Sequence, residues 1–196
     1  MLPISYSVGH EYLHHILAGY KRLDGPRAEA AAHQLASILD EFLRRHEACL
    51  ARAAGVAGFQ IVTTVPSSQP SRDFDHPLRR VVSQLVSATQ DRHQRLLRRS
   101  ALPVQSRHFD ARRFEALSPL PGQNVLLVDD TWTTGASAQS AAAALRSAGV
   151  ATVAAVVIGR YVNRPYYDDN RLIGQAPFTW ETCALCANGK ALRRAA

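Results

Sequence analysis

One stretch of the chain decides the fold: Val125-Leu126-Leu127-Val128-Asp129-Asp130-Thr131-Trp132-Thr133-Thr134-Gly135-Ala136-Ser137. Its four branched apolar residues in a row are typical of a strand buried on both faces of a parallel sheet. Two carboxylates come at the end of this strand. A hydroxyl-rich turn then leads into an Ala-rich helix over residues 137–148, which Gly149 would end. A second apolar run, at residues 152–158, should lie parallel to the first strand.

The turn after the acidic pair has the features of a phosphate site. In an open α/β sheet, ligands bind outside the carboxyl ends of the strands. A helix N-terminus there favours an anion, because its N–H groups lack partners and the helix dipole is positive at that end. The neighbouring carboxylates can accept hydrogen bonds from ribose hydroxyls. We therefore expect a site for a phosphorylated sugar; the alternative is that the carboxylates cap the helix or lie in an exposed turn.

The same stretch resembles the binding motif of the type I phosphoribosyltransferases, a 13-residue site for phosphoribosyl pyrophosphate (PRPP). The family pattern is four apolar residues, two acidic residues, a short Thr/Ser-Gly turn and a closing Ser or Thr, and residues 125–137 contain all of these. The resemblance implies that Asp129 and Asp130 are the catalytic pair and hold the ribose 2- and 3-hydroxyls. It also implies that the 5-phosphate is bound by Thr131, Thr133, Thr134, Gly135, Ala136 and Ser137.

Thr133 narrows the choice within this family. The 6-oxopurine enzymes carry an aspartate at this position, so a hypoxanthine or guanine enzyme is not expected. The Thr-Thr-Gly form is most similar to the ComF-like (competence-associated) group and the amidophosphoribosyltransferases. An acidic pair after an apolar strand also occurs in response-regulator domains, but there the strand lies near the N-terminus and no Thr-Thr-Gly turn follows.

Weaker similarities flank the motif. Residues 6–21, which end at Lys21, resemble the N-terminal segment of ComF-like proteins, and residues 61–68 resemble the strand and turn that bind pyrophosphate. Ser67 and Ser68 are therefore candidate pyrophosphate ligands, with a plain Pro-Ser turn as the alternative. Residues 103–106 resemble the start of a mobile basic loop. Arginines bind phosphate in bidentate fashion, and the candidates are Arg72, Arg79, Arg80, Arg112 and Arg113.

The resemblance implies a reaction in which pyrophosphate leaves C1 of the ribose and a nucleophile replaces it. The protein must hold the sugar, neutralise the leaving group and exclude water, and Mg²⁺ normally bridges the pyrophosphate and ribose oxygens. We expect a Mg²⁺-dependent phosphoribosyltransferase that uses PRPP and an acceptor such as a nitrogenous base or an amine. The alternative is a non-catalytic regulator that binds PRPP or a nucleotide, or a nucleic-acid-associated protein, on the same fold.

A second group of residues has the composition of a metal site. His46 and Cys49 lie three positions apart, on one face of a predicted helix, and Cys183 and Cys186 form a C-x-x-C pair. Together they make a Cys₃His set, a known structural zinc composition. The alternatives are an apolar helix stripe with two unpaired cysteines, or a redox dithiol. The family resemblance does not supply this site, because the zinc finger of ComF-like proteins is a separate N-terminal element.

We expect one phosphoribosyltransferase-like domain over residues 1–196, with an α/β fold. Its Rossmann-like, doubly wound parallel sheet should have about five strands and helices on both faces, with a small hood. Residues 1–57 would form an N-terminal hood and helical part, residues 58–160 the PRPP-binding core, and residues 161–196 a tail with the C-x-x-C pair. The remaining predicted elements are strands at 4–7 and 59–65, helices at 11–19, 27–53 and 77–89, and one short strand within 90–123.

The composition fits a globular protein. The apolar fraction of the 196 residues is 46%, the three cysteines argue against a secreted disulfide framework, and no apolar run could span a membrane. We expect a cytoplasmic protein with no membrane partner, and dimerisation is common among its relatives. The net charge of +7 permits nucleic-acid binding. The favoured interpretation is that the dispersed arginines reflect genomic composition and that some face an anionic substrate.

Overall fold

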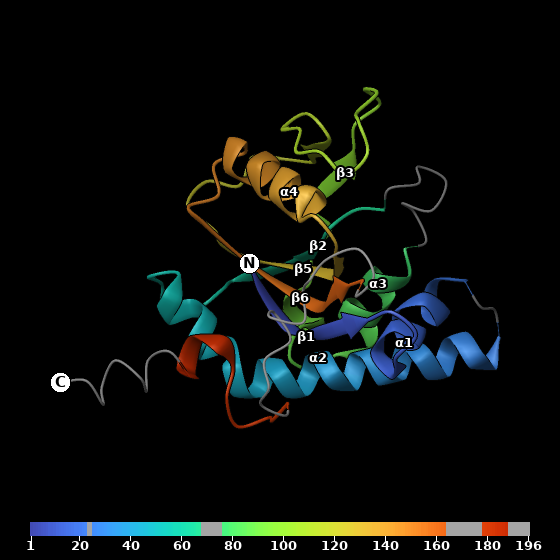
Figure 1. Cartoon of the computed structure of the whole chain (residues 1–196). Helices are drawn as coiled ribbons and strands as arrows, with labels where there is room; N and C mark the ends of the chain where they lie inside the picture. The colour runs from blue at the N-terminus through green and yellow to red at the C-terminus, as the bar shows by residue number, and fades with distance from the viewer. Residues whose placement is uncertain (23–24, 68–75, 164–177, 188–196) are drawn as a thin grey trace.

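A four-stranded parallel sheet forms the centre of the molecule. The computed structural model describes residues 1–22, 25–67, 76–163 and 178–187. The strands follow the order β1-β6-β5-β2, with all three neighbouring pairs parallel, so the fold belongs to the α/β class (Figure 1). Their bounds are β1 (Leu2–Val8), β2 (Ile61–Thr64), β5 (Asn124–Trp132) and β6 (Thr152–Val162).

Helices cover both faces of this sheet, as predicted. On one face lie α1 (Tyr12–Arg22), α2 (Pro26–Ala53) and α3 (Pro77–Arg80), and on the other lies α4 (Ala136–Ser147). Figure 1 shows α4 above the sheet and α2 below it. Residues 1–57, predicted as a hood and helical part, thus supply β1, α1 and α2 to this layered structure.

The position of β5 between two helical layers explains its run of apolar residues. Leu126 and Val128 pack into the core beneath α2, whereas Val125 and Leu127 pack beneath α4, and all four are fully buried. Successive side chains of a strand point to opposite faces. A central strand between two helical layers therefore needs apolar residues at consecutive positions rather than at alternate ones.

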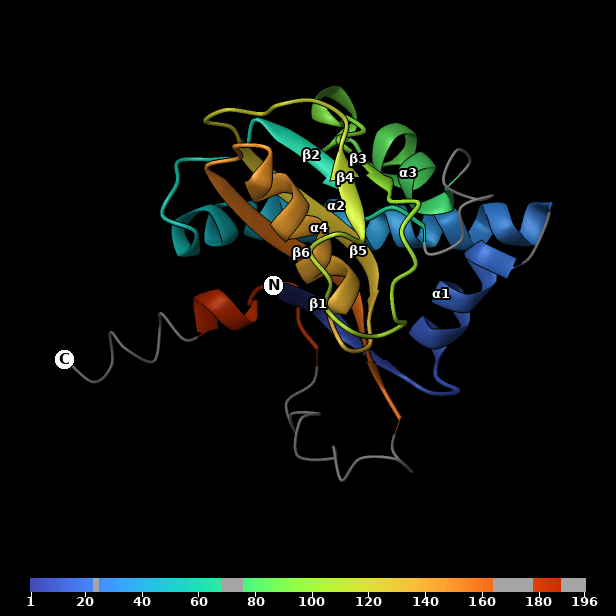
Figure 2. The ribbon, with the colours of Figure 1, turned by 90° about the horizontal axis from the view of Figure 1, so that it is seen from above.

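The sheet has four strands in the described residues, where the sequence predicted about five. Beyond β2 only one parallel bridge forms, between Val62 and His93. The chain then turns away into a separate antiparallel pair, β3 (Leu97–Arg99) and β4 (Phe114–Ala116), which also replaces the single short strand expected within residues 90–123. Figure 2 shows this pair beside β2.

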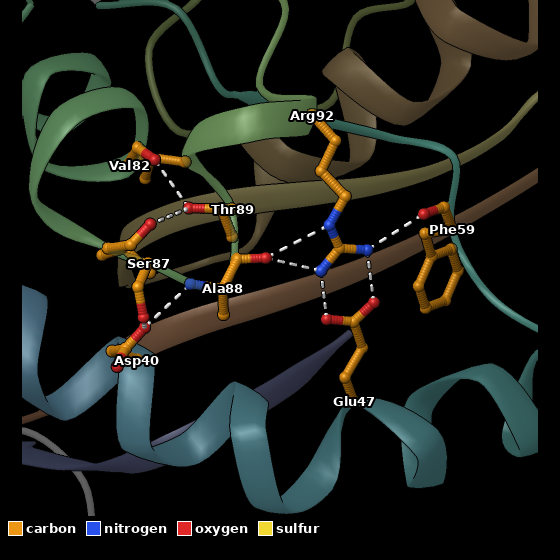
Figure 3. Close-up of polar contacts among 9 residues, drawn as sticks. Asp40, Glu47, Phe59, Val82, Ser87, Ala88, Thr89 and Arg92 are labelled. Carbon is orange, nitrogen blue, oxygen red and sulfur yellow. Dashed lines mark hydrogen bonds and ion pairs between the residues drawn. The ribbon is translucent and has the colours of Figure 1, made fainter.

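The helix predicted over residues 77–89 is shorter than expected. After α3 it continues only as a π-helical turn, Val81–Leu85. The Thr89 hydroxyl donates to the carbonyls of Val82 and Val86 at 2.6 and 3.3 Å, and the Asp40 carboxylate of α2 accepts from the Ala88 N–H at 2.9 Å (Figure 3). These partners satisfy backbone groups that further helical turns would otherwise use.

Arg92 fastens the segment after this turn to α2. Its guanidinium pairs in bidentate fashion with the Glu47 carboxylate, at 2.6 and 2.5 Å, and also donates to the carbonyls of Ala88 and Phe59 (Figure 3). The C-terminal half of α2 is therefore joined to the chain that follows β2.

Within the described ranges, no helix combines the length and the apolar character that a membrane crossing requires.

Candidate functional site

A cavity of about 460 Å³ opens at the carboxyl ends of β2 and β5. The chain leaves β2 toward α3 on the α2 face of the sheet, and it leaves β5 toward α4 on the opposite face. Two neighbouring parallel strands whose connections part in this way leave a crevice between them, which is where ligands bind in open α/β sheets.

The predicted sugar-phosphate residues line this cavity. It is bounded by Asp129, Asp130, Thr131, Thr133, Thr134, Gly135, Ala136 and Ser137 after β5, by Val65, Pro66 and Ser67 after β2, and by Lys21, His76, Pro77, Ser106, Arg107 and Arg113 from elsewhere. Every predicted sugar-phosphate and pyrophosphate-turn residue therefore lies on the wall except Ser68, which falls outside the described residues.

Asp129 and Asp130 lie on the two faces of β5. The buried Asp130 carboxylate accepts a hydrogen bond from the Tyr20 hydroxyl and pairs with the Lys21 ammonium at 2.5 Å, both from α1. Asp129 is half-buried on the α4 side, and its carboxylate accepts the Asp130 N–H at 2.9 Å. Lys21 thus forms an ion pair with Asp130, whereas it acts on Asp129 only through its charge.

This difference separates the acidities of the two groups. Burial, and then the charge of Asp130, raises the pKa of Asp129 to about 7. Burial opposes ionisation of Asp130 as well, but the Lys21 ammonium and the Tyr20 hydroxyl hold its pKa below the ordinary value. The Tyr20 phenol has a pKa well above 10, because it is buried beside this carboxylate. One charged carboxylate and one that gains a proton near neutrality therefore share the wall.

The close approach of α1 to the sheet depends on Gly159 in β6. A Cβ atom there would lie 2.6 Å from Leu17 Cδ1 of α1 and 3.0 Å from Ser7 Cβ of β1. Real Cβ atoms do not tolerate such contacts with packed neighbours. The absence of a side chain at this position allows α1 to bring Tyr20 and Lys21 to the acidic pair.

The turn before α4 is shaped by Gly135. This residue has φ 79°, occupies the N-cap of α4 and carries no side-chain cap. A Cβ here would lie 3.0 Å from Trp132 Nε1. The Thr134 hydroxyl accepts the Ala136 N–H at 3.3 Å and donates to the Arg107 carbonyl at 3.2 Å. The turn therefore has no cap from the N-cap residue itself, Thr134 caps the first N–H of α4, and the same hydroxyl ties the turn to the loop that precedes β4.

Arg113 holds the loop between β3 and β4 in place. Its Nη2 donates to the carbonyls of Gln105 and His108 at 2.7 Å each, and the side chain is buried. The exposed Arg112 pairs with Asp110. Among the arginines proposed to bind pyrophosphate, Arg113 alone lies on the cavity wall in the described residues. Arg80 pairs with Glu29 on α2, Arg79 belongs to α3, and Arg72 falls outside the described residues.

Trp132, which stands within the motif stretch, lies at the end of the central strand. It is the last residue of β5, paired in register with Arg160 of β6, and the Arg160 guanidinium stacks 4.7 Å from the centre of its ring. The indole is half-buried on the sheet and is absent from the cavity wall.

Sequence reasoning missed three residues on this site: Tyr20, His76 and Arg107. Tyr20 comes directly before Lys21, the residue that ends the segment similar to ComF-like proteins, so its neighbour was the only available signal. His76 comes before α3, and its charge contributes to the lowered pKa of Asp130. Arg107 has a positive φ of 61°. No sequence motif indicates that His76 or Arg107 lies at the site.

The predicted Cys₃His set comes together at a second place. The ligand atoms of His46, Cys49, Cys183 and Cys186 all lie within 4.8 Å of one another, an arrangement that could hold a metal ion. His46 Nδ1 lies 3.9 Å from Cys49 Sγ and 4.0 Å from Cys186 Sγ, while its Nε2 is 2.9 Å from the Trp180 carbonyl. None of the four residues lines the cavity.

Comparison of the chain with protein-family models and with curated proteins gave no match.

Proposed function

We propose that the chain is a phosphoribosyltransferase that transfers the 5-phosphoribosyl group of PRPP to an acceptor and releases pyrophosphate. One observation carries the proposal: an acidic pair, an open glycine turn at a helix start and a serine turn from the neighbouring strand line a single cavity at the carboxyl edge of the sheet. PRPP has three corresponding parts, namely a ribose, a 5-phosphate and a pyrophosphate.

The 5-phosphate would bind at the start of α4. The first N–H groups of a helix have no partners within the helix; Gly135 brings no side chain to cap them, and the Thr134 hydroxyl accepts that of Ala136. A phosphate supplies the missing acceptors, and the helix dipole favours its charge. The hydroxyls of Thr133 and Ser137 line the same part of the wall.

The ribose would lie over Asp129 and Asp130. Ionised carboxylates accept hydrogen bonds from the 2- and 3-hydroxyls, and their charge stabilises the positive charge that develops on the ring as pyrophosphate leaves. Lys21 has a second role here, because it keeps Asp130 ionised in a buried position. The acceptor would approach C1 on the side opposite the leaving group.

Pyrophosphate would face Ser67, Arg107 and Arg113 across the cavity. Mg²⁺ would supply a hard cation that neutralises this leaving group, and the oxygens of the acidic pair are the ligand class it prefers. The Cys₃His cluster is a different kind of site, since its thiols and imidazole suit a softer ion such as zinc rather than Mg²⁺.

The test is a titration of the protein with PRPP and Mg²⁺ by calorimetry, followed by an assay of pyrophosphate release with a panel of nitrogenous bases and amines. We expect saturable binding and acceptor-dependent release. Asp129→Asn and Asp130→Asn should each weaken binding at least about tenfold, the equivalent of about 1.4 kcal/mol lost from hydrogen bonds to a charged group.

Asp91→Asn is the matched control, because this exposed acid lies in the turn Gln90–Arg92, away from the cavity. Equal PRPP titrations for the wild type and both site variants would remove the ribose assignment. Tight PRPP binding with no release for any acceptor would contradict catalysis and support a PRPP-binding regulator.

A further inference from the structure

We propose that His46, Cys49, Cys183 and Cys186 form a closed tetrahedral zinc site that fastens residues 178–187 to α2. This function is separate from the chemistry of the cavity. The cluster joins chain segments far apart in the sequence, since Cys186 and His46 are 140 positions apart. Figures 1 and 2 both show the segment that contains Cys183 and Cys186 beside the C-terminal part of α2.

The interatomic distances fit a zinc centre. At Zn–S and Zn–N bond lengths of about 2.3 and 2.0 Å, tetrahedral ligands lie about 3.6 Å (N to S) to about 3.8 Å (S to S) apart. The observed separations from His46 Nδ1 to the sulfurs of Cys49 and Cys186 are 3.9 and 4.0 Å. The other separations are at most 4.8 Å, so a contraction of at most about 1 Å closes the site around an ion.

The orientation of His46 also suits a ligand. Its Nε2 lies 2.9 Å from the Trp180 carbonyl and donates a hydrogen bond to it, because a carbonyl can only accept. The neutral ring then carries its lone pair on Nδ1, the nitrogen that faces the cysteines. Metal-bound histidines are typically fixed by such a bond from the second ring nitrogen. The ring is buried and packs against Phe42.

The sulfurs are placed for an ion rather than for a dithiol. A redox pair needs only two cysteines, whereas here the three cysteines of the chain converge on one imidazole nitrogen. All of them are free thiols. The Cys183 N–H lies 3.0 Å from Cys186 Sγ and donates to it, which helps to fix the position of this sulfur.

The arrangement indicates a structural role. Four protein ligands complete the tetrahedron and leave no position for water or substrate, as in structural zinc sites. Cys183 is buried in the core beneath α2, with Trp180 and Leu185 packed against it. His46 lies 20 residues after the start of α2, about 30 Å along the helix axis. That start follows Lys21, so the cluster is remote from the cavity.

The experiment measures metal content in the purified full-length protein by plasma mass spectrometry, with His46→Gln, Cys49→Ser and Cys183→Ser as variants. We expect about one zinc per wild-type chain and less than about a tenth of that in each variant. His33→Gln is the matched control, since it alters an exposed histidine of the same helix, and it should keep the zinc.

Replacement of the ion by Co²⁺ gives a second readout that does not depend on variant folding. A tetrahedral site with three thiolates should show intense visible d–d bands and sulfur-to-cobalt charge-transfer bands, both reversed by added zinc. The proposal is overturned if wild-type protein expressed with zinc carries none. It is equally overturned if the ion is retained by His46→Gln, or if the native protein contains a disulfide between Cys183 and Cys186.

Discussion

Asp129 and Asp130 are adjacent in the chain yet differ in chemistry, because a strand points successive side chains to opposite faces. Asp130 faces α1 and receives the Lys21 ammonium and the Tyr20 hydroxyl. Asp129 faces the α4 side, where its carboxylate accepts the Asp130 N–H and Lys21 acts on it only through its charge. A buried carboxylate without a cation is costly to ionise, and a second charge one residue away adds to this cost.

The raised pKa of Asp129 predicts a pH-dependent gain in stability for Asp129→Asn. Between its ordinary value of 3.8 and about 7, the folded wild type retains a proton that the unfolded chain has lost, so its stability falls as the pH rises. Each pKa unit is about 1.4 kcal/mol, and each kcal/mol moves Tm by about 3 °C in a chain of this size.

After allowance for partial exposure of the side chain, we expect Asp129→Asn to melt roughly 5 °C above wild type at pH 8 and to lose most of this gain at pH 5. Differential scanning calorimetry at the two pH values measures the effect, with Asp91→Asn as an exposed control. Equal melting temperatures at pH 8 would show that ionisation of Asp129 does not destabilise the folded protein.

The pair between Lys21 and Asp130 predicts non-additive variants. Lys21→Met leaves a buried carboxylate without its cation and should lower the free energy of unfolding by about 2 kcal/mol, less than for a fully buried pair because Lys21 is 37% exposed. The double variant Lys21→Met/Asp130→Asn should recover at least about 1 kcal/mol of this loss. Urea denaturation of the four proteins measures the cycle. Strict additivity would show that the two groups do not interact.

At the level of elements, the π-helical turn and the fastening by Arg92 show how tertiary contacts override local preference. Residues 77–89 have a helical pattern and a proline at the favoured first position. The helix nevertheless ends early, because Thr89 and Asp40 offer its backbone groups other partners. Such a partner from α2, 48 positions away for Ala88, leaves no local sequence signal.

Arg92 predicts a large loss of stability for a residue that does not line the cavity at the carboxyl ends of β2 and β5. Arg92→Met removes both hydrogen bonds to Glu47 and those to two carbonyls, and leaves the Glu47 carboxylate, 19% exposed, without its cation. We expect a loss of about 2 kcal/mol in urea denaturation. Arg45→Met breaks an exposed i,i+4 pair with Glu41 on α2. It should lower the free energy of unfolding by less than about 0.5 kcal/mol. Similar losses for the two variants would contradict this difference.

The elements that the sequence predicts correctly are those with a local signal. The central strand, the helix after it, the parallel partner at β6 and the long α2 all follow from apolar periodicity and from glycine or proline at the ends. The position of Ser67 on the wall follows from its place after a buried strand. The contact between Tyr20 and Asp130 spans 110 positions and depends on a missing side chain at Gly159, so no pattern within either segment announces it.

At the level of the whole molecule, α2 connects two places of different chemistry. This helix has 28 residues and is therefore about 42 Å long. Its start follows Lys21 on the cavity wall, and its C-terminal half carries His46 and Cys49. Asp40, and Glu47 beside His46, join it to the segment after β2. The cavity lies near the start of this helix, and the Cys₃His cluster lies about 30 Å further along its axis and offers a different class of ligand atoms.

The two proposed sites should therefore be separable by experiment. Removal of the ion by a chelator should lower Tm by at least about 5 °C, because metal binding contributes directly to folding. It should leave the PRPP dissociation constant within about twofold of its value before chelation at 20 °C, where the rest of the core remains packed. Asp130→Asn should show the opposite pattern, with weakened PRPP binding and a full complement of zinc. Loss of PRPP binding on chelation, while circular dichroism still reports the native helix content, would show that the C-terminal segment shapes the cavity and that the two sites are coupled.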